Sequence, residues 1–184
     1  MDVGCGTGKY THLFTQFGMD CLGVDISREG ILQAKDRSPN SKFVVGDVTN
    51  MSFKYKSFDI LYCSGLSLFN ETDLSVLTPF TTNMLKFLKD NGLFVFIKTS
   101  RLSDKFSKNN TRFDYSIQSF MTFFNKINGL NTIAVSGTYP QIFLVLRGYG
   151  FSNLLTSLSV LNTKLTGIGL RICIILKMTS QTDK

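Results

Sequence analysis

Residues 2–10, "DVGCGTGKY", decide the fold that we predict for this chain. Glycines stand at positions 4, 6 and 8, directly after a short apolar run and ahead of a segment with helical spacing. Glycine has no Cβ, so a turn between a strand and a helix can bring backbone N–H groups and the helix N-terminus close to a ligand. The stretch therefore predicts a nucleotide site. A glycine-rich turn alone is a weak signal, because a purely structural tight turn produces it too.

The spacing of the glycines separates the kinds of nucleotide site. A dinucleotide fingerprint that starts at Gly4 requires a glycine at position 9, where Lys9 stands. A Walker phosphate loop requires four residues between its glycines and then Lys-Ser or Lys-Thr, but only three residues separate Gly4 from Gly8, and Tyr10 follows the lysine. The chain instead satisfies DxGxGxG, with Asp2 as the acidic residue, and a nicotinamide enzyme is left as a distant alternative.

Two further carboxylates follow the next two predicted strands. Asp25 ends "GVDIS", where an acidic side chain can accept hydrogen bonds from both hydroxyls of a ribose. Asp47 lies in "GDV" after the third strand, where it could accept from the exocyclic amine of an adenine, with the Val48 amide nearby. We therefore expect three strand ends to converge on one ligand.

The pattern of apolar runs predicts an α/β fold. Short β-branched and aromatic runs alternate with longer segments of helical period, which is typical of a βαβ series around a mostly parallel sheet. The runs are nearly all apolar, as strands covered on both faces must be, so we expect helices on both sides of the sheet. The first five strands are predicted in "MDV", "CLGVDI", "KFVVGDV", "DILYCSG" and "LFVFIK".

Helices are expected at residues 8–17 and 28–35 and, in two pieces joined near Pro79, within residues 71–89. "KDNG" predicts the end of the second piece, with Gly92 as its left-handed stop before the fifth strand.

The regular rhythm changes after Lys98, so we expect an inserted cap or substrate region at residues 101–138 within one domain that spans residues 1–184. A helix with one apolar face is predicted inside it, formed by Ile117, Phe120, Phe124 and Ile127. A helix at 141–150, a strand at 152–160 and a last apolar strand at 169–178 are expected to complete the domain.

Composition limits the class of protein. The chain has 184 residues, 43% of them apolar, which fits one globular domain. No run reaches the about 18 apolar residues that a membrane span needs, and no leader precedes the glycines, so we expect a soluble, cytoplasmic protein. Four scattered cysteines and one histidine offer no metal site at workable spacing. The net charge of +7 fits either solubility or an anionic partner.

The chain resembles the class I S-adenosylmethionine-dependent methyltransferases over nearly its whole length. That resemblance implies a doubly wound, Rossmann-like sheet of seven strands whose last strand is antiparallel, and S-adenosylmethionine as cofactor. Family members usually have a longer first strand, whereas three residues precede Gly4 here, so we expect a truncated first strand. The segments that carry the resemblance are "DVGCGTGKYTHLF", "GVDIS", "GDVTNMSFKYKSFDILYCSG", "LKFLKDNGLFVF", "LRGYGF" and "ICIILKM".

The resemblance also implies roles for single residues. The glycine turn, with Cys5 inside it, would surround the methionine part of the cofactor, and Asp2 would help to hold its amino group. Asp25 would bind the ribose, and Ile26 would pack on the adenine, whose edge Asp47 and Val48 would contact. Cys63 would contribute its carbonyl near the cofactor amine, while its side chain is more simply interpreted as a small buried core cysteine. The cofactor-binding candidates are thus Asp2, Gly4, Cys5, Gly6, Gly8, Asp25, Ile26, Asp47, Val48 and Cys63.

The sequence defines the methyl acceptor less clearly than it defines the cofactor. "CSGLSLFN" after the fourth strand lacks the Asn/Asp-Pro-Pro motif of amino-base methylases, and no proline precedes a cysteine, as a carbon-5 pyrimidine enzyme would require. No catalytic residue is assigned. Basic residues and an aromatic helix in the insertion would suit an anionic or amphipathic small molecule. The alternatives are an RNA or protein methyltransferase that docks through the basic insertion, and a non-catalytic binding module of the same fold.

Overall fold

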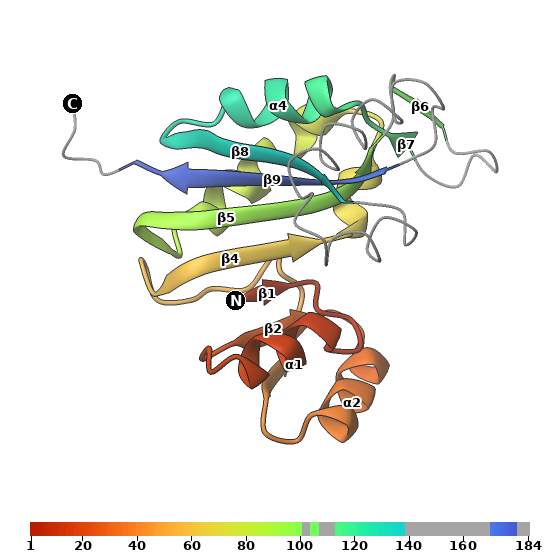
Figure 1. Ribbon diagram of the computed structural model, residues 1–184, viewed down its shortest axis with the longest axis vertical. Coiled ribbons are helices and arrows are strands. Elements are labelled where there is room, and N and C mark those ends of the chain that lie inside the picture. The colour runs from red at the N-terminus through yellow and green to blue at the C-terminus, as the bar shows by residue number, and fades with distance from the viewer. Residues whose placement is uncertain (101–103, 107–112, 139–169, 180–184) are drawn as a thin grey trace, which may run out of the picture.

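The structure is a computed structural model that describes residues 1–100, 104–106, 113–138 and 170–179 (Figure 1). Within these residues seven strands form one sheet in the order β3-β2-β1-β4-β5-β9-β8. β1 to β5 are mutually parallel, β9 runs antiparallel to β5, and β8 runs antiparallel to β9. The predicted doubly wound sheet with an antiparallel last strand is confirmed. The strands are β1 (Asp2–Val3), β2 (Leu22–Asp25), β3 (Lys42–Val45), β4 (Phe58–Ser64), β5 (Leu88–Ser100), β8 (Leu130–Thr138) and β9 (Leu170–Met178).

The two-residue strand β1 lies in the middle of the sheet. Val3 is opposite Val24 of β2 on one side and Cys63 of β4 on the other, and it is fully buried. Both neighbours therefore hold the start of the glycine turn in place. A separate two-stranded ladder pairs β6 (Lys105–Phe106) with β7 (Phe113–Asp114).

The helices match their predicted positions in the first half of the chain. α1 (Lys9–Gln16) follows the glycine turn, and α2 (Arg28–Arg37) begins after Ser27, whose hydroxyl accepts a hydrogen bond from the Gly30 amide at 3.0 Å. Such an N-cap satisfies one of the free amides of the first turn. Two short 3₁₀ helices, η1 (Ser67–Asn70) and η2 (Leu74–Leu77), precede α3 (Thr78–Leu85), and α4 (Ile117–Asn125) comes later.

Side-chain alternation along the strands places helices on both faces of the sheet. Tyr62 of β4 contacts the rings of Tyr10 and Phe14 on α1, with ring centroids 5.2 and 4.9 Å apart. Its neighbours along β4 point to the opposite face, as the two-residue period of a strand requires. On that face Phe96 of β5 packs against Phe120 and other aromatic rings of α4. A buried aromatic core under α4 therefore supports the far half of the sheet.

The start of β5 differs from the prediction. α3 ends at Leu85, β5 already begins at Leu88, and the left-handed residue is Asn91, with φ of 62°. Asparagine tolerates this conformation better than most residues. Gly92 is needed for another reason, because a Cβ there would lie 2.8 Å from Leu88 Cδ1. Close packing, rather than a left-handed backbone, explains this glycine.

The boundary of the predicted insertion is also wrong at its end. Residues 130–138 form β8, an edge strand of the main sheet paired with β9. The strand was missed because its sequence, "LNTIAVSGT", mixes polar and apolar residues, as an edge strand does, instead of forming an apolar run. The helix predicted at 141–150 and the strand predicted at 152–160 lie outside the described residues. A substrate role for the rest of the insertion stays a prediction.

Candidate functional site

The glycine turn is fixed on the end of β2 by backbone hydrogen bonds. The amides of Gly4 and Cys5 both donate to the Val24 carbonyl, at 2.8 and 3.0 Å. Gly4, Gly6 and Gly8 have φ angles of 72°, 52° and 75°, a left-handed conformation that costs other residues about 1–2 kcal/mol each. The alternating glycines therefore let the chain reverse direction tightly between β1 and α1.

Asp25 connects the glycine turn with the next two strand ends. Its Oδ2 accepts the Gly6 amide at 2.7 Å, its Oδ1 accepts the Ser27 amide at 2.8 Å, and its carbonyl accepts the Gly46 amide at 2.9 Å. A carboxylate has about four lone-pair sites, so two accepted amides leave capacity for two more donors. The position suits the pair of hydroxyls of a ribose.

The space beside Asp25 is open. A Cβ built on Gly6 would have no heavy atom within 4 Å, and the side chain of Ile26 is 70% exposed at the end of β2. An exposed isoleucine next to a carboxylate that is already oriented by backbone amides forms an apolar platform beside a polar anchor. This combination fits an adenosine group, whose base has flat faces that pack on apolar side chains and whose sugar carries hydroxyls.

Asp47 stands at the end of the third strand, as predicted. Its carboxylate accepts the Thr49 amide at 2.9 Å, the Thr49 hydroxyl at 2.7 Å and the Asn50 side-chain amide at 3.0 Å. The Thr49 amide is the largest cause of its lowered pKa. Asp47 is thus an ionised acceptor in a tight turn. Val48 is partly buried against the core beside it.

Asp2 lies beneath the turn and not on its open side. It is 2% exposed, and its Oδ2 accepts a hydrogen bond from the hydroxyl of Thr11 on α1 at 2.7 Å. Burial raises the pKa of this carboxyl, and the Thr11 hydrogen bond opposes that rise. The contact seen is a structural one that ties α1 to β1. Contact with a cofactor amino group stays a prediction.

The two cysteines of the predicted site are unreactive thiols in this fold. Burial raises the pKa of Cys5 and of Cys63 to about 12 each. A thiol with such a pKa is almost entirely protonated at neutral pH and is a poor nucleophile. Cys63 is fully buried between Val3 and Phe96 in the register of the sheet. The predicted role of its carbonyl is not tested by these contacts.

Three residues near the turn were missed by sequence reasoning. Thr11 holds Asp2, Arg37 donates from α2 to the carbonyl and the hydroxyl of Thr7 at 3.2 Å each, and Leu66 lies against Gly4. A Cβ on Gly4 would come within 2.6 Å of Leu66 Cδ1. The contacts of Arg37 with Thr7 and of Leu66 with Gly4 join residues 30 or more positions apart, and no sequence signal announces such contacts. Only the assembled sheet reveals them.

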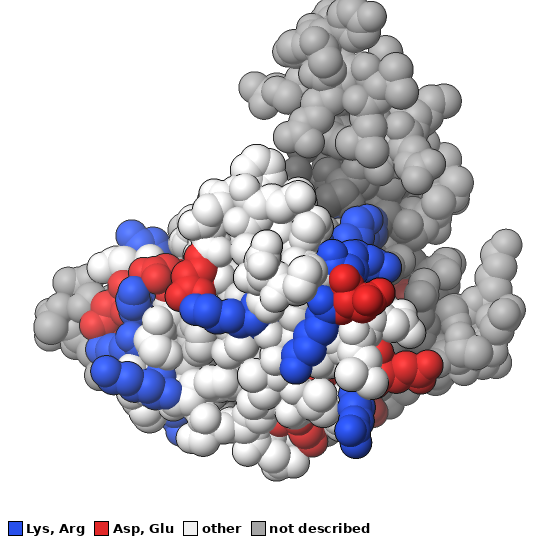
Figure 2. All heavy atoms as spheres, turned by 90° about the horizontal axis from the view of Figure 1, so that it is seen from below, with Lys and Arg blue, Asp and Glu red and all other residues white. Residues whose placement is uncertain are grey.

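Charges of both signs are interspersed at the end of the molecule that carries α1, α2 and β3. Figure 2 shows this face, where lysine and arginine lie among aspartate and glutamate and no single sign forms a continuous patch on the described surface. Lys42 and Asp20 form one such exposed pair at 2.7 Å. Within the described residues, no three His, Cys, Asp or Glu side chains gather as metal ligands would. None of the described helices has the length and apolar character that crossing a bilayer demands.

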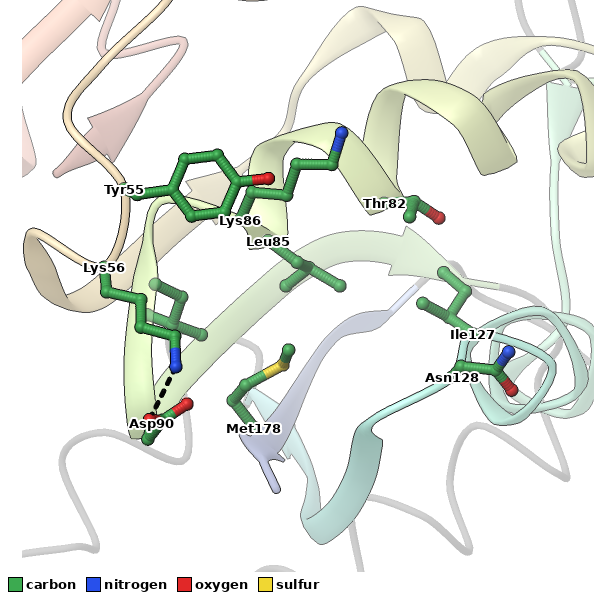
Figure 3. Close-up of a pocket in the computed structure, with 10 residues that line it drawn as sticks. Tyr55, Lys56, Thr82, Leu85, Lys86, Asp90, Ile127, Asn128 and Met178 are labelled. Atoms are coloured by element: carbon green, nitrogen blue, oxygen red, sulfur yellow. Dashed lines mark hydrogen bonds and ion pairs between the residues drawn. The ribbon is translucent and has the colours of Figure 1, made fainter. Parts of the chain in front are cut away.

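A hollow of about 240 Å³ lies at the opposite end of the parallel strands, beside the amino end of β5 (Figure 3). It is formed where β5 begins at Leu88 and the antiparallel β9 ends at Met178, with Tyr55 and Lys86 along one wall. Lys56 is paired with Asp90 at 2.7 Å across its rim. Ligands of open α/β sheets bind at the carboxyl ends of the parallel strands, so this hollow is not the candidate site.

Comparison with known proteins gives the family context of this geometry. The family model described as "Methyltransferase domain" matches residues 1–96, which contain the glycine turn, Asp25, Asp47 and Cys63. The chain is 31% identical over 101 residues to a demethylmenaquinone methyltransferase of Renibacterium salmoninarum, covering 54% of this chain and 40% of that protein. It is 34% identical over 68 residues to norajmaline N-methyltransferase of Rauvolfia serpentina, covering 33% and 23%. The chain thus matches less than half the length of these relatives.

Solved structures share the fold at low sequence identity. An S-adenosylmethionine-dependent methyltransferase from Mesorhizobium loti superposes with a TM-score of 0.67 and 14% identity, covering 96% of this chain and 88% of that one. Geranyl diphosphate C-methyltransferase from Streptomyces coelicolor, solved with S-adenosyl-L-homocysteine, has a TM-score of 0.67 and 16% identity, covering 97% and 70%. At these identities the similarity concerns the fold alone.

Proposed function

Because the chain belongs to the methyltransferase domain family, as its sequence resemblance predicted, we propose that it binds S-adenosylmethionine and transfers the methyl group to a small-molecule acceptor. The observation that carries this proposal is the arrangement around Asp25. Its carboxylate is oriented by the amides of Gly6 and Ser27, and open space and the exposed Ile26 lie beside it. These features suit an adenosine group held at the carboxyl ends of the first strands.

Different residues of the site contact different parts of the cofactor. Asp25 accepts the ribose hydroxyls, Ile26 packs on the adenine, and Asp47 with the Val48 amide meets the adenine edge. The turn formed by Gly4, Cys5, Gly6 and Gly8 faces the methionine part, where a side chain at position 6 would occupy the space that the ligand needs. Asp2 contributes by holding α1 and the turn in place through Thr11.

The chemistry asks little of the protein beyond positioning. When bound, S-adenosylmethionine supplies a methyl group already activated by the sulfonium. The chain then has to hold the acceptor in line with that methyl group and exclude water, and alignment of this kind accounts for much of the rate of such displacements. We therefore assign no catalytic residue.

A small-molecule acceptor is favoured over RNA or protein by two observations. By name, the two relatives reported above are methyltransferases of demethylmenaquinone and of norajmaline. Both of these compounds are small molecules. Lys98, a basic residue near the end of β5 just before the insertion, is only 5% exposed and so adds no charge to an exposed docking surface. The acceptor itself is part of the proposal.

Titration of S-adenosylhomocysteine into the purified full chain tests the cofactor site. The variant to compare with wild type is Asp25→Asn, which keeps the size of the side chain but removes its charge and one acceptor oxygen. Loss of hydrogen bonds to a charged group costs about 1.5–3 kcal/mol each, so affinity should fall at least about tenfold. Asp36→Asn, at an exposed carboxylate on α2, is the matched control and should bind like the wild type.

Two results would contradict the proposal. One is a wild-type chain that stays folded in circular dichroism but shows no binding heat with S-adenosylhomocysteine. The other is equal affinity in Asp25→Asn and Asp36→Asn, which would remove Asp25 from the site. Transfer of labelled methyl from S-adenosylmethionine to a panel of phenols, quinols and amines then tests the reaction itself.

A further inference from the structure

The hollow of Figure 3 lies at the far end of the parallel strands from the candidate cofactor site. Its volume is about 240 Å³, and segments that are distant in sequence meet around it. They are the turn before β4, the end of α3, the start of β5, the turn between α4 and β8, and the end of β9. The proposed function makes no use of this hollow.

The floor of the hollow is apolar. Leu85, Leu88 and Ile127 line it and are buried, and Met178 lines it from β9. Tyr55 stands at the rim and is 62% exposed. Apolar surface that is covered by a ligand leaves water at a gain in free energy, and an exposed aromatic ring adds the option of stacking. The hollow therefore suits a ligand with a flat apolar body.

The charged side chains of the lining leave one cation without a counterion. Lys56 is paired with Asp90 at 2.7 Å, so these two charges compensate each other (Figure 3). Lys86 lies along the wall beside Tyr55 and forms no ion pair with a residue that the structure describes. The two lysines and one aspartate of the lining thus carry one excess positive charge. Charge complementarity favours an anionic group on the ligand over a cationic one.

The backbone at the rim has an uncommon conformation. Lys56 and Asn91 have φ angles of 50° and 62°, and in the described part of the chain they are the two non-glycine residues with a positive φ. The Lys56 amide donates to the Lys86 carbonyl at 3.0 Å, and Asn91 directly follows Asp90. Left-handed backbone in non-glycine residues is strained and is concentrated at functional sites. Here both such positions adjoin the Lys56–Asp90 pair, which forms one side of the hollow.

We propose that this hollow is a second ligand site, which binds a small carboxylate with a flat apolar body, of the size of benzoate. The apolar body covers the floor and the Tyr55 ring, and the carboxylate pairs with Lys86. The volume is below the about 300–1,000 Å³ of pockets for drug-sized ligands, so the ligand is a small one. The site is independent of the proposed function, because Asp25 and Asp47 lie at the opposite, carboxyl ends of the strands.

Three benzene derivatives of similar shape test the charge preference on the full chain. Benzoate is an anion, benzamide is neutral and benzamidine is a cation, so differences in affinity report the charge and not the apolar body. In NMR titrations at constant ionic strength, we expect saturable shifts of the amide signals of Lys56, Thr82 and Lys86, with benzoate binding most tightly and benzamidine most weakly. Equal affinity for benzoate and benzamide, tighter binding of benzamidine, or the lack of saturable shifts at these amides would overturn the proposal.

Variants of Lys86 test the partner of the carboxylate. Lys86→Met removes the charge and keeps an apolar stem at an exposed position, so the fold should persist. Benzoate affinity should fall about two- to fivefold, the range of an exposed ion pair, and benzamide affinity should not change. Lys86→Arg should retain benzoate binding, and Lys35→Met, at an exposed lysine of α2, is the matched control and should bind like the wild type. Equal benzoate affinity in wild type and Lys86→Met would contradict the assignment.

Saturating S-adenosylhomocysteine separates this hollow from the candidate cofactor site. Benzoate should bind with the same affinity in its presence and absence, because the two sites lie at opposite ends of the strands. Displacement of benzoate, or benzoate shifts centred on Gly6 and Asp25, would place benzoate in the cofactor site and overturn the proposal. A chain that binds benzoate at the hollow but no S-adenosylhomocysteine supports the second site and contradicts the methyltransferase proposal alone.

Discussion

The inner and outer sides of the glycine turn, residues 2–8, differ completely in their surroundings. On the inner side, Asp2 is buried and hydrogen-bonded to Thr11, and a Cβ on Gly8 would lie 2.7 Å from both Ala34 and Phe43. On the outer side, a Cβ on Gly6 would meet nothing. One short motif therefore serves two purposes, and adjacent glycines that look alike in sequence are required for packing in one case and for ligand access in the other.

Alanine at the two glycines should produce the largest contrast. In Gly8→Ala the left-handed strain of about 1–2 kcal/mol adds to overpacking of about 1–3 kcal/mol against Ala34 and Phe43. Gly6→Ala carries the strain alone. Thermal unfolding should thus show a loss of stability roughly twice as large for position 8.

Ligand binding should reverse the order of the two glycine variants. The folded fraction of Gly8→Ala should retain affinity for S-adenosylhomocysteine, whereas Gly6→Ala should lose it because the new methyl group occupies the open space. Equal losses of stability in the two variants would contradict the division between an inner and an outer side.

The fold could be predicted well from the sequence because it depends on local signals. Apolar runs separated by helical segments determined the parallel strands, and the glycine spacing located the turn between β1 and α1. The prediction failed for β8 and for the left-handed Asn91. An edge strand has one side without a strand neighbour and need not be apolar, and the left-handed residue of a turn depends on how the flanking chain packs.

The candidate site was predictable only where it consists of strand ends. Asp25 is the last residue of β2 and Asp47 follows β3 by two residues, so their positions come from strand order. Asp2 belongs to the same glycine motif, yet its side chain points inward. The direction of this side chain depends on its hydrogen bond with Thr11 of α1, which the motif does not specify. The contacts of Leu66 with Gly4 and of Arg37 with Thr7 join segments far apart in the chain, and no periodicity encodes them.

The buried carboxyl on the inner side should make stability depend on pH. Burial raises the pKa of Asp2 above its ordinary value of 3.8, so the folded chain holds this proton more tightly than the unfolded chain. The stabilising contribution of the protonated form is present below about pH 3.8 and is lost as the pH rises through the folded pKa. Asp2→Asn cannot ionise, so its free energy of unfolding relative to wild type should increase over that interval. Urea unfolding at a series of pH values measures this difference.

Asp59→Asn is a control in which the pH dependence of the stability difference from wild type should have the opposite sign. Lys89 lowers the pKa of this exposed carboxyl, so its contribution is present above the ordinary value of 3.8 and is lost as the pH falls through the folded pKa. The difference between this variant and wild type should be small and should shrink toward acid. A difference for Asp2→Asn that does not change with pH would mean that its carboxyl is not perturbed by the inner side.

On the outer side, Ile26→Ser should affect the ligand and not the fold. Ile26 is 70% exposed, so its removal costs little burial in the free chain. Covering such a side chain with an adenine is worth about 1.5 kcal/mol, which corresponds to about tenfold in affinity for S-adenosylhomocysteine. Leu32→Ser, at a residue of α2 that is 59% exposed, is the control and should leave affinity unchanged. A loss of stability in Ile26→Ser without a loss of affinity would contradict the placement of Ile26 on the ligand-facing, outer side of the turn.

The smallest effect is expected where α2 holds the turn from its edge. Arg37 donates to the Thr7 carbonyl and hydroxyl at 3.2 Å from an exposed position, and exposed hydrogen bonds of this kind contribute about 0.5–1 kcal/mol. Arg37→Ala should therefore lower S-adenosylhomocysteine affinity only about two- to fivefold, because the turn that separates Gly6 from Gly8 becomes less restrained. Lys35→Ala on the same helix should have no effect. Arg37→Lys should recover part of the affinity if the contact positions the turn, whereas equal affinity in all three variants would show that the Arg37 contacts do not position it.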